Sequence, residues 1–76
     1  MPTPTEEALT KQRQAQINTL IGYIETLIYD RVTLTIEEAN AMAKRTQVNS
    51  NLKEEITGRI EESRSSIRTL LDLLLP

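Results

Sequence analysis

Apolar residues recur along this chain at the spacing of an α-helix, and that spacing restricts the available folds more than any other feature. The first stripe, between residues 17 and 28, consists of Ile17, Leu20, Ile21, Ile24, Leu27 and Ile28. Its members step by three and four residues, and it is broad enough to bury against more than one neighbouring helix. The spacing predicts a first helix from about residue 4 to residue 30.

Two short segments have the sequence pattern of a helix N-terminus. In the first, Thr3 suits the N-cap, Pro4 suits the first helical position, and Glu6 completes a capping box. The second segment, Thr35-Ile36-Glu37-Glu38, repeats the capping-box pattern. We therefore expect a short connection at 31–35, and short connections favour antiparallel helices.

A second amphipathic stripe follows from residue 36 to residue 75. Its members fall within one arc of a helix: Met42, Val48, Leu52, Ile56, Ile60, Ser63, Ile67, Leu70 and Leu74. The segment Asn49-Ser50-Asn51 contains three poor helix formers, and Asn51 stands three residues before Glu54, as an N-cap does. Because the stripe keeps its phase, we expect one long helix at 36–75, continuous or kinked, with a break at 49–51 as the alternative.

These elements predict an all-α fold, an antiparallel two-helix hairpin that forms a single domain over residues 1–76. The expected contact pairs Ile17, Leu20, Ile24, Leu27 and Ile28 with Met42, Val48, Leu52, Ile56 and Ile60. In this arrangement the second helix is longer than the first, so its leucine-rich end has no cover from its own chain. A hairpin of this size buries little surface, and we expect it to oligomerise through helix packing of the coiled-coil kind.

The leucine-rich end is the predicted partner-binding site. Five of the six residues from Leu70 to Leu75 are leucine, so this segment is apolar nearly all round. A dense apolar patch of this kind marks contact surface. The expected anchors are Ile67, Leu70, Leu71 and Leu74.

The amino-acid composition argues against catalytic, cofactor-binding and metal-binding sites. The chain contains no cysteine or histidine, which removes thiolate nucleophiles, imidazole bases and the usual zinc sites. The paired glutamates, such as Glu37-Glu38, point about 100° apart on a helix and lack an apolar pocket, so a solvated face explains them. Two isolated glycines cannot form a phosphate-binding loop. We expect no enzyme activity, no cofactor and no metal.

The charge pattern bears on partners and location. Nine basic and eleven acidic residues give a net charge of −2, without a basic stripe of the kind that holds nucleic acid. No n-region followed by an apolar h-region opens the chain, so we expect no signal peptide. No apolar run approaches the ~20 residues of a membrane span. We expect a cytoplasmic protein with no membrane span and no small-molecule substrate.

One segment supports a different interpretation. Residues 31–36 alternate strictly, with Arg31, Thr33 and Thr35 on one side, which is a strand pattern. With the helical stretches that follow, residues 31–62 resemble a ribbon–helix–helix DNA-binding unit, in which paired strands enter the major groove. The resemblance implies that Arg31, Thr33 and Thr35 would read base edges. A short loop between helices explains the same residues, and we favour it.

The function favoured by the sequence is therefore that of a small helical interaction protein, such as an accessory protein, adaptor, co-chaperone or inhibitor. It would act by protein–protein binding and self-association as a homodimer or higher oligomer. Helical hairpins of this size occur as secretion co-chaperones and as phage-encoded inhibitors, which fits a bacterial or phage source. The alternative is a DNA-binding transcriptional regulator that uses residues 31–36 as a strand.

Overall fold

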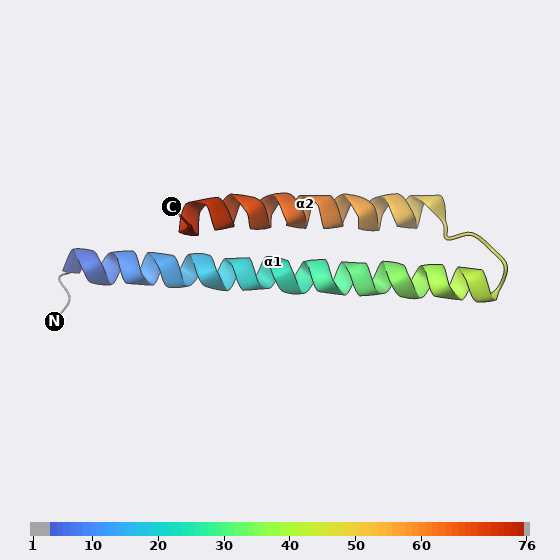
Figure 1. Cartoon of the computed structure of the whole chain (residues 1–76), viewed down its shortest axis with the longest axis horizontal. Helices are drawn as coiled ribbons and strands as arrows, with labels where there is room; N and C mark the ends of the chain where they lie inside the picture. The colour runs from blue at the N-terminus through green and yellow to red at the C-terminus, as the bar shows by residue number, and fades with distance from the viewer. Residues whose placement is uncertain (1–3, 76) are drawn as a thin grey trace.

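The computed structural model describes residues 4–75 and consists of two long helices in one hairpin. Helix α1 (Pro4–Ala43) and helix α2 (Ser50–Leu74) lie side by side and run in opposite directions (Figure 1). The hairpin measures 63 × 17 × 17 Å. The predicted all-α antiparallel hairpin is thus confirmed, as is the start of the first helix at Pro4. The predicted cap, Thr3, lies outside the described residues.

The predicted connection at 31–35 is wrong, because α1 continues through it without interruption. Thr35 does not act as an N-cap. Its Oγ1 instead donates a hydrogen bond of 2.9 Å to the carbonyl oxygen of Arg31, one turn earlier. Thr10, Thr19 and Thr26 make the same bond within α1. A threonine whose hydroxyl is satisfied in this way is accommodated inside a helix, so the resemblance of 35–38 to a capping box was misleading.

The chain turns at residues 44–49 instead. Two backbone bonds close the end of α1: the N–H of Thr46 donates to the carbonyl of Ala41 at 2.8 Å, and that of Arg45 to Met42 at 3.1 Å. Arg45 has a φ of 55°. This pair of bonds around a left-handed residue is the Schellman motif, in which glycine is the usual left-handed residue.

Helix α2 begins with a side-chain cap. The Oδ1 of Asn49 accepts hydrogen bonds from the backbone N–H groups of Asn51 at 2.9 Å and Leu52 at 3.3 Å. The continuous second helix is therefore wrong, and the alternative of a break holds with other bounds: the interruption lies at 44–49, and Ser50 and Asn51 already belong to α2. The capping residue is Asn49, whereas the sequence pointed to Asn51.

The two helices pack against each other through one stripe of side chains on each helix. We call the contact formed by these two stripes the seam. On α1 the seam consists of Gln16, Leu20, Leu27, Asp30, Leu34, Glu37 and Ala41, and on α2 of Ile56, Ile60, Ser63, Ile67, Leu70 and Leu74, all buried or half-buried. Ile56 and Ile60 are the best buried apolar side chains, with 5% and 6% of their surface exposed. Their predicted place in the core is confirmed, and Leu20 and Leu27 are half-buried as expected.

Part of the predicted core is wrong. Ile17, Ile24 and Ile28 are exposed on the surface of α1, and Met42 is the most exposed large apolar side chain of the chain described, at 80%. The reason is the position of the turn. Because the helices are joined at 44–49 and not at 31–35, α2 pairs with a later stretch of α1 and meets a different face of it.

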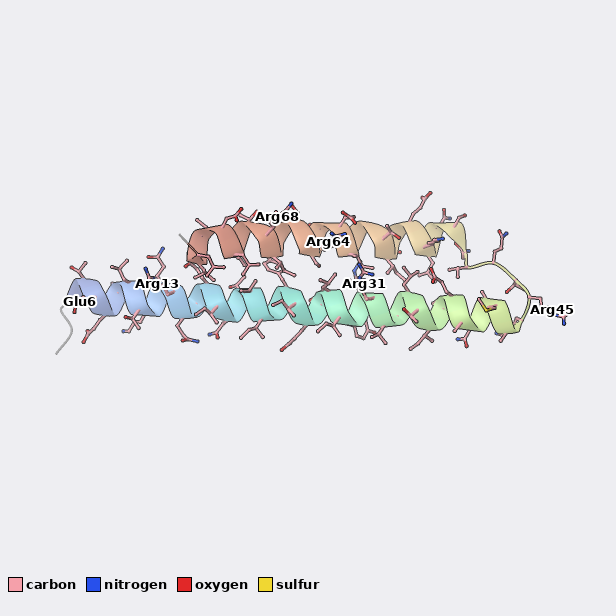
Figure 2. The ribbon with its side chains drawn as sticks, in the orientation of Figure 1. Glu6, Arg13, Arg31, Arg45, Arg64 and Arg68 are labelled. Carbon is pink, nitrogen blue, oxygen red and sulfur yellow. The ribbon has the colours of Figure 1, made fainter. Side chains whose placement is uncertain are left out.

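The overhang also belongs to the other helix from the one predicted. Helix α1 has 40 residues and α2 has 25, so the first turns of α1 extend past the C-terminal end of α2 (Figure 1). Glu6 and Arg13 lie on this extension (Figure 2). The leucine-rich end of α2 lies alongside α1, contrary to the prediction that it has no cover. Within residues 4–75, neither helix combines the length and apolar character required to cross a membrane.

Candidate interaction surface

Helix α1 carries a second apolar stripe beside the seam. It consists of Ile17, Ile21, Ile24 and Ile28, which step by four, three and four residues. Between 38% and 58% of the surface of each side chain is exposed. At about 100° per residue, these positions lie roughly 50–100° around α1 from the seam leucines Leu20 and Leu27. Helix α1 is therefore apolar over a wider arc than α2 covers.

Helix α2 adds apolar residues on the same side of the hairpin. In an antiparallel pair, positions rotated in the same sense from the two seams lie on one side. By this geometry Ile67, Leu71 and Leu74 adjoin the α1 stripe. A shallow groove on this side is lined by Leu27, Ile67 and Leu71, among others. We call this surface the isoleucine face, and it comprises Ile17, Ile21, Ile24, Ile28, Ile67, Leu71 and Leu74.

The opposite side of the hairpin is polar. A second groove there is lined by Tyr23, Thr26, Arg59, Glu62, Ser63 and Ser66. Only Tyr23 contributes a large ring, and hydroxyl and charged groups make up the rest. The hairpin thus has one apolar side and one polar side, and the apolar side is the stronger candidate for contact with another protein.

The polar side contains the least exposed side chain of the described chain. Asp30 is 2% exposed, and its Oδ1 lies 3.2 Å from Nη2 of Arg59 across the seam. The side chain of Arg59 is 52% exposed. The second carboxylate oxygen of Asp30, Oδ2, is buried and has no hydrogen-bond partner among the described residues. One half-exposed guanidinium therefore provides the ion pairing of a nearly fully buried carboxylate.

Charged residues of both signs border the isoleucine face. On α2 the rim consists of Glu61, Arg64, Arg68 and Asp72, which line the groove beside Leu71. Arg64 donates a hydrogen bond from Nη1 to Oε1 of Glu61 at 3.4 Å. Arg31 extends from α1 toward α2 (Figure 2). An apolar centre with a polar, charged rim is the usual anatomy of a protein–protein contact surface.

The structure divides the four predicted anchors. Ile67 and Leu74 are half-buried in the seam and Leu71 is 39% exposed, and all three belong to the isoleucine face. Leu70 is also half-buried in the seam, but it lines a separate groove with Thr19 and Tyr23. The most exposed leucines of this end are Leu73 and Leu75, at 65% and 68%.

Sequence reasoning assigned the isoleucines of α1 to the core and so missed them as surface. The signal that marks them is the width of the stripe at 17–28. Six apolar positions within twelve residues are more than one partner helix covers, so part of the stripe had to remain exposed in a two-helix fold.

The residues of the strand interpretation do not form a common surface. Arg31, Thr33 and Thr35 belong to α1, and no strand occurs in residues 4–75. Residues that are two positions apart in a helix lie roughly 200° apart around its axis, so Thr33 faces away from Arg31 and Thr35. Thr33 is half-buried, whereas Arg31 and Thr35 are exposed. The structure therefore removes the ribbon on which the DNA-binding interpretation depended.

No group of three or more potential metal-ligating side chains occurs in the part of the chain that the structure describes. Comparison with models of protein families, with curated proteins and with solved structures found no match for this chain.

Proposed function

We propose that this chain is a small, non-enzymatic interaction protein that works by packing the isoleucine face against helical surfaces of other protein chains, including its own. The observation that carries the proposal is the exposed apolar stripe of α1, which lies on the same side of the hairpin as Ile67 and Leu71 of α2. Ile21 and Ile28 of this stripe are 47% and 58% exposed. A surface of this kind favours association because burying it removes apolar area from water.

The mode of binding that suits this face is completion of a helix bundle. Helices of a bundle pack nearly parallel or antiparallel with side chains at three- and four-residue spacing interleaved. The stripe of α1 already has that spacing, and the straight hairpin presents it along one side. A partner would therefore contribute one or two helices aligned with α1 and α2.

A capture experiment tests the proposal. Immobilised protein would be exposed to lysate of the source cells, and wild type compared with a variant carrying Ile21→Asp and Ile28→Asp. Leu73→Asp serves as the control, because Leu73 is 65% exposed but lies on the other side of α2. It follows Ser66 and Thr69 at steps of three and four residues, and these two line a groove there with Tyr23. We expect the face variant to lose captured proteins that the control retains. Equal capture by all three proteins would contradict the proposed function.

A further inference from the structure

The isoleucine face requires an occupant, and the surface area of the chain indicates which one. A compact monomer of 8.6 kDa exposes about 4,700 Å² of surface. This chain exposes 6391 Å², about 1,700 Å² more than that expectation. Obligate homodimers bury roughly 1,000–2,500 Å² on each subunit, so the surplus is the amount that one copy of the chain would cover.

The interior of the hairpin leads to the same conclusion. Among the described residues, the only buried apolar side chains are Ile56 and Ile60. Two-layer helix packing stabilises a domain through a continuous apolar core, and two residues do not make one. Docking the isoleucine face against apolar side chains would extend this core sideways from the seam.

The face is also compatible with a copy of itself. A two-fold contact brings identical surfaces together, so a face with a large net charge would repel its mate. The α2 rim carries two acidic residues, Glu61 and Asp72, and two basic ones, Arg64 and Arg68. The seven residues that define the face are all apolar, so two copies would meet through isoleucine and leucine side chains.

We infer that the occupant of the isoleucine face is a second copy of this chain, and that two hairpins pack face to face as a four-helix bundle. This inference rests on the proposed function, since it names the partner of the same surface. The bundle would bury Ile17, Ile21, Ile24 and Ile28 of both copies between the two hairpins. The polar side with Asp30 and Arg59 would remain outside.

Sedimentation velocity over low to high micromolar concentrations tests the inference. We expect wild type and Leu73→Asp to sediment as dimers with equal affinity. The variant with Ile21→Asp and Ile28→Asp should dimerise at least about 100-fold more weakly, because a carboxylate buried without a partner is strongly unfavourable. A monomeric wild type, a face variant of unchanged affinity, or equal weakening by Leu73→Asp would each overturn the inference.

A second measurement does not depend on destabilising substitutions. The chain contains no cysteine, so single cysteines at Ile24 and at Leu73 provide probes on the two sides of the hairpin in otherwise wild-type protein. A short bismaleimide should cross-link two copies through Ile24→Cys and not through Leu73→Cys. Equal yields from both positions would contradict the face-to-face arrangement.

The two proposals fail separately. If wild type is monomeric but its capture of other proteins depends on Ile21 and Ile28, the homodimer is wrong and the interaction function stands. If a monomeric wild type instead binds lipid vesicles through the face, the occupant is a membrane surface and the homodimer is likewise overturned. If the dimer depends on the face but capture of other proteins does not, the homodimer stands and the proposed binding of other proteins through this face is wrong.

Discussion

The ion pair between Asp30 and Arg59 should be strongly asymmetric in its contribution to stability. Asp30 is almost fully buried, while half of the Arg59 side chain is in water. Removing the arginine leaves a buried carboxylate with no cation and with Oδ2 still unpartnered. Removing the aspartate releases the guanidinium to solvent at little cost. The expectation is therefore that Arg59→Ala destabilises the hairpin much more than Asp30→Leu does.

The magnitude follows from the burial. Breaking a fully buried ion pair by removing one partner destabilises a protein by about 3–5 kcal/mol. The solvent around Arg59 screens the interaction, so we discount this to about 2–3 kcal/mol for Arg59→Ala. Asp30→Leu places an apolar side chain in the seam one turn from Leu27 and Leu34. We expect it to change the free energy of unfolding by less than about 1 kcal/mol, or to stabilise the hairpin.

A double-mutant cycle measures the coupling directly. Urea unfolding of wild type, Arg59→Ala, Asp30→Leu and the double variant would be followed by far-UV circular dichroism. The chain concentration must be fixed, because self-association raises apparent stability. With Asp30→Leu already present, Arg59→Ala should cost less than about 0.5 kcal/mol. An equal cost of Arg59→Ala in both backgrounds would refute the view that Arg59 acts by pairing with Asp30.

Three further predictions concern the helix ends and the glycines. Arg45→Gly should raise the free energy of unfolding by about 1 kcal/mol in urea titrations, because glycine adopts the left-handed φ of 55° without steric penalty; a loss of stability would contradict this account of the turn. Asn49→Ala should lower it by about 1 kcal/mol through loss of the cap on α2, and Asn49→Ser should recover most of that loss; no difference between the two would mean that the cap contributes nothing. Gly22→Ala and Gly58→Ala should each stabilise by about 0.5–1 kcal/mol, since a Cβ at either position meets nothing within 4 Å and alanine is the better helix former; a decrease in melting temperature would show that a close contact exists at these positions.

The sequence predicted the class of the fold but not the place of the turn. Apolar spacing identifies helices because it reports one buried side, and the antiparallel hairpin followed from two such stripes. The position of the turn was not predicted because Arg45, and not glycine, occupies the left-handed position at the end of α1. At the same time Thr35 offered a capping pattern that the helix satisfies internally through the carbonyl of Arg31. The sequence thus lacks a helix-end signal where α1 ends, and it carries a capping pattern at Thr35, inside α1.

The error at the turn explains the errors at the site. Because the predicted turn was misplaced, the prediction paired the wrong residues of the two helices and assigned the wrong side of α1 to the core. Ile56 and Ile60 were predicted correctly because α2 has a single apolar stripe. Ile24 and Ile28 were not, because α1 has two stripes and sequence alone does not say which one meets α2. The buried Asp30 was also unpredicted, since a charged residue in the seam gives no apolar signal.

Packing against another chain would explain why α1 has two apolar stripes. If α1 served only to cover α2, one apolar stripe on α1 would be enough. The isoleucines beside the seam would then expose apolar surface without stabilising the hairpin. Their alignment with Ile67 and Leu71 of α2 makes one surface from two helices, and it lies on the side away from the Asp30–Arg59 pair. Polar residues in the seam stabilise the hairpin less than apolar ones would, and this loss is tolerable if the main core forms elsewhere. The dimer proposed above would account for both the weak seam and the exposed apolar face, because packing against a second copy would complete the core.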